Sequence, residues 1–330
     1  MVITIPAASR AGNGPRPINV NTDIPQLLKL LEDVFGEKMD DKSRRLLSTN
    51  ASLSASPAFL WRLNPMASKL ATGYVWEENG RVVGNATLLN TKIPGRYLVV
   101  NVAVDPDFRR RGIARALMQH LQAMARQRGA RELLLQVVKD NKPAVDLYLS
   151  LGYRKLGSMT TWASSVSRVR ELPLPADGDI PYRAVRELRR SEWRAAYTLD
   201  LACLHPDLNW PEPLSRDAYK TGLWQRLQDF LNGRTSETWV IAGDHRQLLG
   251  LASIWSEWGR AHRASLRVHP EWRGQLERPL LAKLLRRLKY LARRNVQIHH
   301  DDADELVSQL LRESNFRPRR TLTHMRLDLP

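Results

Sequence analysis

The sequence predicts a mixed α/β (α+β) protein built from two tandem copies of one domain, each with a mostly antiparallel central sheet flanked by helices. Three observations predict this fold. The chain has 330 residues, which exceeds one ordinary domain. The same order of strand and helix patterns occurs twice. A strand–helix–strand crossover around residue 112 implies local parallel pairing, so each sheet is expected to be mixed.

The internal repeat is visible as matched segments in the same order. Strand–turn–strand patterns, a strand running into Asp/His-Pro, a long helical pattern and a short helix with its following turn all recur. Partner positions lie 166 residues apart at Gly84 and Gly250, 164 at Val104 and Val268, and 163 at Tyr153 and Phe316. Four matches in one order indicate a duplicated domain.

Composition shifts divide the chain into four parts. Between the two copies lies a stretch rich in Ser and Pro with little apolar periodicity, typical of a linker. We therefore expect a flexible N-terminal lead at 1–17, a first domain at 18–163, a linker at 164–181 and a degenerate second domain at 182–330.

Periodicity predicts the elements of the first domain in order. Asp23 is expected as the N-cap of the first helix, and Gly129 and Gly152 are expected to end later ones. The expected elements are a strand at 18–20, helices at 24–34 and 40–50, strands at 73–78, 81–90 and 97–104, a helix at 113–128, a strand at 133–138, a helix at 143–151 and a strand from residue 153. In the second domain a helix is expected at about 279–294.

Charge and cysteine content restrict the functional classes. Lys and Arg number 51 against 34 Asp and Glu, a net charge of +17, so the protein attracts anions such as a phosphate-bearing cofactor or nucleic acid. The single cysteine, Cys203, excludes an internal disulfide framework and a thiolate metal cluster. No apolar stretch approaches the ~20 residues of a membrane helix. We expect a cytoplasmic protein without a metal. His299-His300-Asp301-Asp302 could suggest a metal site, but adjacent residues of a strand point to opposite faces, so a solvated loop at a strand end is the favoured interpretation.

The segment Arg109–Ala114 carries the main chemical signal. It follows a strand that ends at Asp105-Pro106 and opens a helix, whose N-terminal amides and dipole favour a pyrophosphate. Gly112 lets the backbone approach such a ligand, Ala114 keeps the first turn slim, and the arginines, including Arg115, add positive charge. Taken alone, the hexapeptide is equally compatible with a charged turn before an amphipathic helix.

Residues 102–117, with Leu135-Gln136-Val137, Asn141 and Leu147–Tyr153, resemble the GNAT superfamily of N-acetyltransferases. The family signature Arg/Gln-x-x-Gly-x-Gly/Ala falls on Arg109–Ala114. The close match covers about residues 73–160. The resemblance implies acetyl-CoA as the acyl donor and assigns these residues: Val102, Ala103 and Val104 to the pantetheine amides; Arg109, Arg110, Arg111, Gly112, Ile113, Ala114 and Arg115 to the pyrophosphate; Asn141 to the coenzyme arm; and Tyr148 to protonation of the departing thiolate.

The expected chemistry needs no protein nucleophile, because an amine attacks the thioester directly. Tyr148 has an alternative interpretation as a core aromatic on a short helix. Many family members carry a glutamate base in the strand position occupied here by Gln136, whose amide accepts no proton. Glu77 and Glu78 are weak replacements beside a predicted turn, so the base stays unassigned.

The second copy has lost the features assigned to the coenzyme. In the repeat alignment Leu276 replaces Gly112, Arg278 replaces Ala114 and Leu311 replaces Tyr148, while Glu277 adds negative charge. We expect this domain to bind no CoA in the usual way. It is expected to complete the acceptor pocket or pack against the first domain.

Three functions remain open. The favoured one is transfer of acetyl from acetyl-CoA to a primary amine of a small molecule or peptide in the first domain. The second is a non-catalytic acyl-CoA sensor, suggested by Gln136 and the degenerate copy. The third, and least favoured, is a nucleic-acid-associated acetyltransferase, suggested by the charge. The sequence leaves the acceptor, the acyl length and the oligomeric state open.

Overall fold

The computed structural model describes residues 12–36, 72–173, 185–209, 216, 219, 229, 231–243 and 247–330. The helix predicted at 40–50, the first eleven residues of the predicted lead and the part of the predicted linker from residue 174 lie outside the described residues. None of the helices in the described ranges is long and apolar enough to cross a bilayer.

The chain forms two compact units that each combine separate segments. Unit 1 contains residues 1–136, 143–154 and 326–330, and unit 2 contains residues 137–142 and 155–325. Strands β5, β6 and β12 therefore each contribute residues to both units. The predicted domain boundaries at 18–163 and 182–330 take no account of this exchange and stay a prediction.

The strands follow the order β1-β2-β3-β4-β5-β12-β6-β11-β10-β9-β8-β7. Pairing is antiparallel except between β4 and β5 and between β10 and β11, among the strand pairs whose register is defined. This confirms the predicted mixed, mostly antiparallel fold. β12, the last strand of the sequence, lies between β5 and β6, which come from the middle of the sequence.

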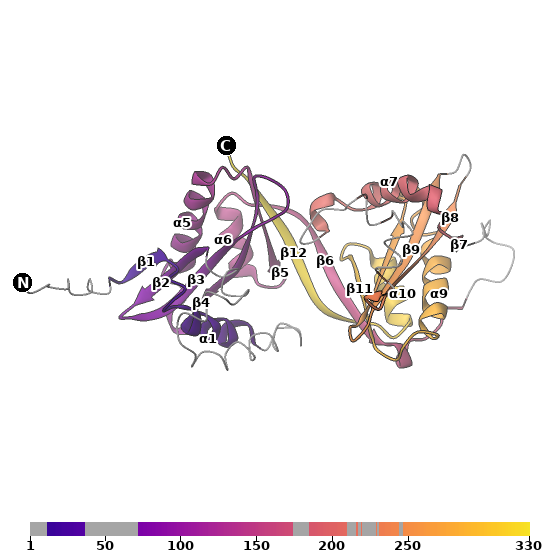
Figure 1. The fold of residues 1–330 in the computed structure, drawn as a ribbon, viewed down its shortest axis with the longest axis horizontal. Coiled ribbons are helices and arrows are strands. Elements are labelled where there is room, and N and C mark those ends of the chain that lie inside the picture. The colour runs from indigo at the N-terminus through magenta and orange to yellow at the C-terminus, as the bar shows by residue number, and fades with distance from the viewer. Residues whose placement is uncertain are drawn as a thin grey trace, which may run out of the picture. The chain divides into compact units, whose positions relative to one another are not determined.

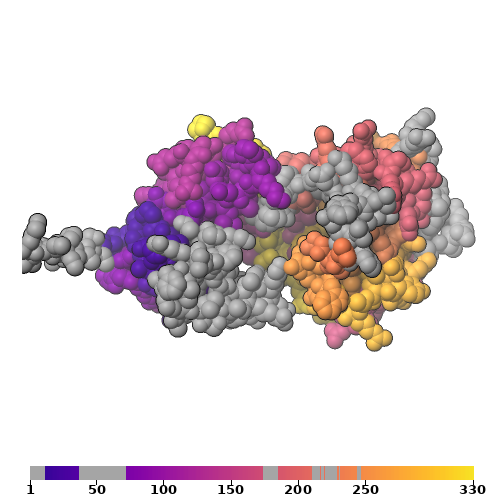
Figure 2. Space-filling view, in the orientation of Figure 1, coloured from indigo at the N-terminus to yellow at the C-terminus, as the bar shows by residue number. Residues whose placement is uncertain are grey.

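In the first copy the elements closely match the prediction. They are β1 (Gly14–Pro17), α1 (Ile24–Phe35), β2 (Gly73–Glu78), β3 (Arg81–Asn90), β4 (Arg96–Val104), α5 (Ile113–Gln127), β5 (Glu132–Val138), α6 (Lys142–Ser150) and β6 (Arg154–Ser165). Figure 1 shows α1 and α5 on opposite faces of β1–β4. The space-filling view shows the indigo atoms of residues 12–36 next to the purple atoms of the rest of the first copy (Figure 2).

The second copy repeats this order. Its elements are β7 (Arg186–Glu187), α7 (Trp193–Cys203), β8 (Arg234–Ala242), β9 (Leu248–Glu257), β10 (His262–Val268), α9 (Glu277–Leu288), β11 (Asn295–Asp301), α10 (Glu305–Glu313) and β12 (Arg317–Asp328). The helix predicted at about 279–294 begins and ends earlier. Its basic pattern continues beyond Leu288, but the backbone turns there to enter β11.

The first strand differs from its prediction at 18–20. β1 is Gly14–Pro17, inside the predicted lead, and pairs with β2. The Arg16 guanidinium donates to Asp23 at 2.7 Å and to Glu77 at 2.6 Å, which fixes this register by charge. Ile18 instead packs against the α1 cluster. Asp23 does occupy the N-cap position of α1, but its carboxylate receives Arg16 and makes no capping bond.

Matching glycines bring a helix close to the sheet in each copy. A Cβ on Gly84 would lie 2.9 Å from Cγ2 of Ile113 on α5, and one on Gly250 would lie 2.6 Å from a methyl carbon of Leu280 on α9. Leu117 and Leu121 continue the buried α5 stripe predicted from periodicity. Close helix–sheet packing therefore explains why the repeat keeps these two glycines.

Candidate active site

An opening between two parallel strands lies at the centre of the candidate site in the first copy. The registered pairing of β4 with β5 covers Arg96–Leu98 opposite Glu132–Leu134. Farther along, β4 pairs on its other side with β3, Ala103 opposite Asn85 and Val104 opposite Gly84. The predicted residues Val102, Ala103 and Val104 thus lie where β4 has no registered partner in β5, and their backbone amides and carbonyls face that opening or β3.

A bulge in β4 precedes this opening. Asn101 has a φ of 55°, in the left-handed region, and the β3–β4 register shifts between Asn85 and Thr87. The fully buried Asn85 side chain donates from Nδ2 to the Asn101 carbonyl at 2.8 Å and so supports the bulge. Bulges redirect a strand and are frequent beside functional sites. Sequence reasoning missed this pair, since an Asn inside an apolar strand was its only signal.

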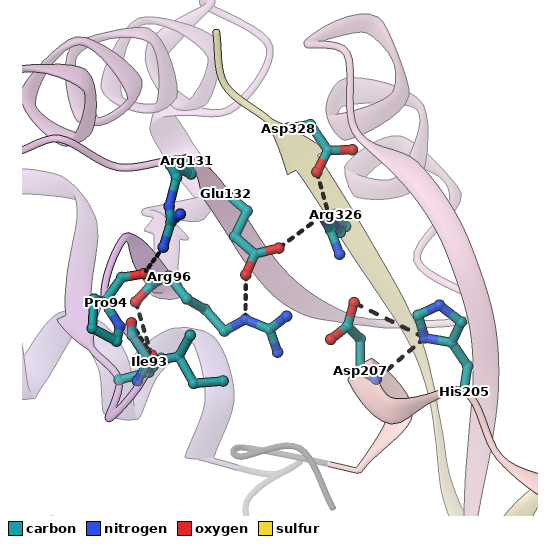
Figure 3. Close-up of polar contacts among 10 residues, drawn as sticks. Ile93, Pro94, Arg96, Arg131, Glu132, His205, Asp207, Arg326 and Asp328 are labelled. Carbon is teal, nitrogen blue, oxygen red and sulfur yellow. Dashed lines mark hydrogen bonds and ion pairs between the residues drawn. The ribbon is translucent and has the colours of Figure 1, made fainter. Parts of the chain in front are cut away.

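An ionic cluster closes the other end of the same strand pair (Figure 3). Arg96 donates from Nε to Glu132 at 2.5 Å, and Arg326 of β12 approaches the second Glu132 oxygen at 2.8 Å. The Arg96 and Glu132 side chains are only 10% and 12% exposed. Because this end is held by charge pairs, β4 and β5 diverge only towards their C-terminal ends, where the predicted coenzyme residues lie.

The turn before α5 has the geometry expected of an anion-binding loop. Asp105 accepts the amide of Asp107 and caps a short 3₁₀ turn at Pro106–Phe108. Two residues then have positive φ, Arg110 at 65° and Gly112 at 80°. Gly112 is the N-cap of the 15-residue helix α5, and a Cβ there would meet no atom within 4 Å. Backbone conformation, together with the space that a ligand would need, therefore accounts for this glycine.

Four exposed arginines surround this turn. Arg109 donates to the Val104 carbonyl at 3.2 Å, Arg111 to the Asp107 carbonyl at 3.1 Å and Arg115 to the Ser150 hydroxyl at 2.8 Å. All three side chains and that of Arg110 are exposed. Among the described residues, no carboxylate forms an ion pair with any of the four. Their field is therefore available to an anionic ligand at the open N-terminus of α5.

Tyr148 lies on α6 and is 6% exposed. Burial raises the pKa of its phenol to about 12, so the hydroxyl stays protonated at neutral pH. Its ring contacts Tyr153 edge-on, with centroids 5.9 Å apart. Tyr148 is therefore packed in the core and carries its proton at neutral pH. Its role as proton donor stays a prediction. Asn141 lies just before α6, with its side chain exposed and its amide bonded to the Val138 carbonyl.

The structure gives less support than the sequence to Glu77 and Glu78 as the catalytic base. Glu77 is 8% exposed and accepts Arg16, while Glu78 accepts the Trp76 indole at 3.1 Å. Both carboxylates are therefore already engaged. Gln136 is half-buried on β5, at the strand position named from the resemblance. The base stays unassigned.

The second copy has the same backbone plan with different chemistry. β10 and β11 pair in parallel over His262–Ala264 and Val296–Ile298. The turn before α9 has one positive φ, 88° at Gly274, and its N-cap Leu276 has a φ of −108°. Leu276, the counterpart of Gly112, is 5% exposed and packs in the core. The Glu277 carboxylate accepts the Gly274 amide at 3.0 Å, so that amide is already bonded.

Comparison with known proteins agrees with this geometry. The sequence profile described as the Acetyltransferase (GNAT) family matches residues 36–153. The ribosomal protein bS18-alanine N-acetyltransferase of Escherichia coli K12 is 34% identical over 101 residues, which are 30% of this chain and 67% of that protein. A peptidyl-lysine N-acetyltransferase of the same organism is 37% identical over 83 residues, 25% of this chain and 50% of that protein.

Fold comparison extends over nearly the whole chain. A GCN5-related N-acetyltransferase from Sphaerobacter thermophilus superposes with a TM-score of 0.59 over 95% of both chains, at 16% sequence identity. At this sequence identity the similarity shows a shared fold. Membership of a family is shown by the relatives with higher sequence identity. Taken together, the motif, the fold and these relatives show that the chain belongs to the GNAT family and is an acyltransferase, an N-acetyltransferase of the acetyl-CoA-dependent type.

Proposed function

We propose that the first copy transfers an acetyl group from acetyl-CoA to a primary amine of a peptide or small molecule. Val102–Val104 would pair with the pantetheine amides, Arg109–Arg115 would bind the pyrophosphate, and Asn141 would contact the coenzyme arm. Tyr148 would protonate the leaving thiolate. The second copy would bind no CoA.

One observation carries this proposal. Four guanidinium groups without an ion-paired carboxylate among the described residues surround the N-terminus of α5, directly beyond the open edge of β4. An anionic ligand there would gain charge-assisted hydrogen bonds and the favourable helix dipole. A diphosphate linked to an extended amide chain matches both the turn and the strand edge.

The reaction follows from direct attack. The amine nitrogen would form a bond to the thioester carbonyl carbon, and the carbon–sulfur bond would break with its electron pair going to sulfur. A backbone amide at 102–104 would stabilise the oxyanion. Tyr148 would give its proton to the thiolate, and the proton released by the amine would restore the phenol through solvent. The net products are an amide and a free thiol.

The acceptor class rests on the relatives' own substrates. They are named as N-acetyltransferases of an alanine of ribosomal protein bS18 and of a peptidyl lysine. A further relative is a streptothricin acetyltransferase, 34% identical over 79 residues and 42% of that protein. The first two acceptors are amines on peptides, which supports an amine on a peptide or small molecule here.

Matched glycine variants test the location of the coenzyme. Gly112→Ala and Gly274→Ala each place a Cβ at positive φ in open space, so both should cost about 1 kcal/mol of folding stability. Calorimetry of the full chain with CoA should show at least about tenfold weaker binding in Gly112→Ala, since 1.4 kcal/mol equals that factor. Gly274→Ala should bind like the parent. Equal effects, or an effect only in Gly274→Ala, would contradict the proposal.

A non-catalytic acyl-CoA sensor is the second candidate, favoured by Gln136 and by the engaged glutamates. A thiol-release assay with a panel of peptides and amines distinguishes the two. Tight CoA binding with no release above hydrolysis for any amine would favour the sensor.

A further inference from the structure

A buried polar side chain on β3 distinguishes the first copy from the second. Asn85 is 0% exposed. Its counterpart on β9, also one residue after the matching glycine, is Leu251, which is 1% exposed and packs in an apolar cluster. A leucine suits such an interior position better than an amide does, because a buried amide loses its hydrogen bonds to water. Burial alone therefore does not explain why the first copy has an asparagine there.

The Asn85 carboxamide uses only its nitrogen. Nδ2 donates to the Asn101 carbonyl at 2.8 Å and to the Thr87 hydroxyl at 3.2 Å, whereas the buried Oδ1 has no hydrogen-bond partner. Rotating the amide by half a turn would place its oxygen against the Asn101 carbonyl oxygen, so the nitrogen must face that carbonyl. An unbonded buried oxygen is unfavourable. The bond to Asn101 is therefore the contact that accounts for this residue.

Asn101 lies where β4 contains one residue more than β3. Between the registered pairs Asn85–Ala103 and Thr87–Val100, β3 contributes one residue and β4 contributes two. Asn101 has a φ of 55°, in the left-handed region that asparagine tolerates better than most residues. Side chains and backbone groups alternate along a strand, so the extra residue changes the side towards which the following backbone groups point.

The second copy has a regular ladder at the same place. β9 and β10 pair without a register shift from Trp255 opposite Arg263 to Gly250 opposite Val268. The whole of β10 is described, and none of its residues has a positive φ. The asparagine and the bulge thus occur together in the copy proposed to bind the coenzyme, and both are absent from β9 and β10.

We propose that Asn85 is a positioning residue for acetyl transfer in the first copy. By donating to the Asn101 carbonyl it keeps β4 in the bulged register, which turns backbone amides of residues 102–104 towards the pantetheine and the thioester. Asn85 itself touches neither substrate. This role rests on the proposed function of the first copy. The turn before α5 has its own contacts, such as Asp105 with the Asp107 amide, so its binding of the diphosphate does not depend on Asn85.

Calorimetry of the full chain with two ligands tests this role. Acetyl-CoA contains the pantetheine arm, whereas its nucleotide part, 3′-phosphoadenosine 5′-diphosphate, lacks it. Asn85→Leu, which copies Leu251, should weaken acetyl-CoA binding about tenfold, the factor expected for a lost hydrogen bond to the ligand, and leave nucleotide binding unchanged. The matched control Thr87→Val removes the other acceptor of the Asn85 amide and should leave both affinities unchanged.

Substitutions at Asn101 test the bulge while Asn85 stays in place. Glycine adopts positive φ readily, so Asn101→Gly should bind acetyl-CoA like the unmutated chain. A β-branched residue resists positive φ, so Asn101→Val should lose acetyl-CoA affinity as Asn85→Leu does and keep its nucleotide affinity. Both variants retain the hydrogen-bonding capacity of the Asn85 side chain, which separates the backbone conformation from the amide itself.

Three outcomes would overturn the role of Asn85. They are unchanged acetyl-CoA binding by Asn85→Leu, an equal loss of nucleotide binding in that variant, and unchanged acetyl-CoA binding by Asn101→Val. Failure of the proposed function has a different signature, because the unmutated chain would then bind neither acetyl-CoA nor the nucleotide, and the role of Asn85 would fail with it.

Discussion

The turns before α5 and α9 have similar backbone conformations but differ in the charge of the side chains at the helix start. In each, a short 3₁₀ turn ends at an arginine, and the next residue has positive φ, Arg110 in the first copy and Gly274 in the second. The copies differ at the helix start. Gly112 leaves the amides of α5 open, whereas Glu277 places its own carboxylate on the Gly274 amide.

If the first turn binds a diphosphate as proposed, this difference gives a physical reason why the second turn would not. An acidic side chain at the first helical position supplies the negative charge that the helix N-terminus favours. The second copy therefore keeps the stabilising electrostatics and needs no ligand to provide them. In the first copy no side chain caps the start of α5, where the diphosphate is proposed to bind.

The largest expected effect concerns Tyr148, whose counterpart is Leu311 on α10. Tyr148→Phe should lower kcat about 10²- to 10⁴-fold and alter the alkaline limb of the pH–rate profile, because a general acid is lost. Steady-state thiol release across pH measures this. Tyr153→Phe, on the ring that contacts Tyr148, is the matched control and should retain most activity. An unaltered profile in Tyr148→Phe would assign the proton to another group.

The next largest effect is on stability, and it concerns the contacts beside the parallel strand pair in each copy. The first uses the Arg96–Glu132–Arg326 cluster, and the second uses the buried His262, which bonds the Ala292 carbonyl at 2.9 Å. Glu132→Gln should destabilise the protein by roughly 2–3 kcal/mol in urea unfolding, since it removes the largely buried carboxylate that lies between Arg96 and Arg326. Asp328→Asn, at a carboxylate 53% exposed beside Arg326, should cost under about 0.5 kcal/mol. Comparable losses would show that the cluster does not hold β4 to β5.

The third prediction is that the two units lose stability at different pH when the solution is acidified. Burial lowers the pKa of His324 in unit 2 to about 4 from 6.5. The unfolded chain then binds more protons below pH 6.5, so stability falls between pH 6.5 and 4, by about 2 kcal/mol at pH 5. In unit 1, burial opposes the ionisation of Asp23, but hydrogen bonds from Arg16 outweigh it and lower the pKa below 3.8, so this stability persists until pH falls below that value.

Hydrogen exchange at pH 7.5 and 5 resolves the two units. Peptides of unit 2 should lose protection at pH 5 before those containing Asp23, and His324→Gln should remove most of that pH dependence. Retention of the full dependence in this variant would assign it to other groups.

The smallest expected effect compares single arginines. Arg110→Gln should weaken CoA binding about tenfold and reduce its salt dependence, because a charged hydrogen bond contributes about 1.5 kcal/mol or more. Arg273→Gln, one position earlier in the equivalent turn, should leave CoA affinity unchanged. Calorimetry at two salt concentrations checks both. A larger loss in Arg273→Gln would place the coenzyme in the second copy.

Local patterns were enough to predict most of the fold. The apolar stripe through Leu117 and Leu121 and the glycine at the start of α5 each depend on neighbouring residues, and the structure confirms both. The roles of Tyr148, Asn141 and the 102–115 segment came from the family resemblance and stay predictions.

The features missed by sequence reasoning depend on distant partners. The β1 register rests on Arg16 bonding Glu77, 61 residues away, and the β4 bulge rests on Asn85 bonding Asn101. His300 looked like a solvated residue, but its strand position turns it inward to Asp304 and its neighbour His299 outward. The alternation of side chains along β11 could have predicted that His300 points inward. The Glu277 contact with Gly274 could not be predicted, because it depends on the conformation of the turn.

The segmented composition of unit 1 has a consequence for how the protein is made. Residues 326–330 belong to that unit, and Arg326 contributes to the cluster on Glu132. The catalytic half proposed here is therefore synthesised early but completed only after the whole intervening half has been translated. A deletion or bulky fusion at residue 326 should damage the first unit before the second, and neither half can be separated at a linker and kept whole.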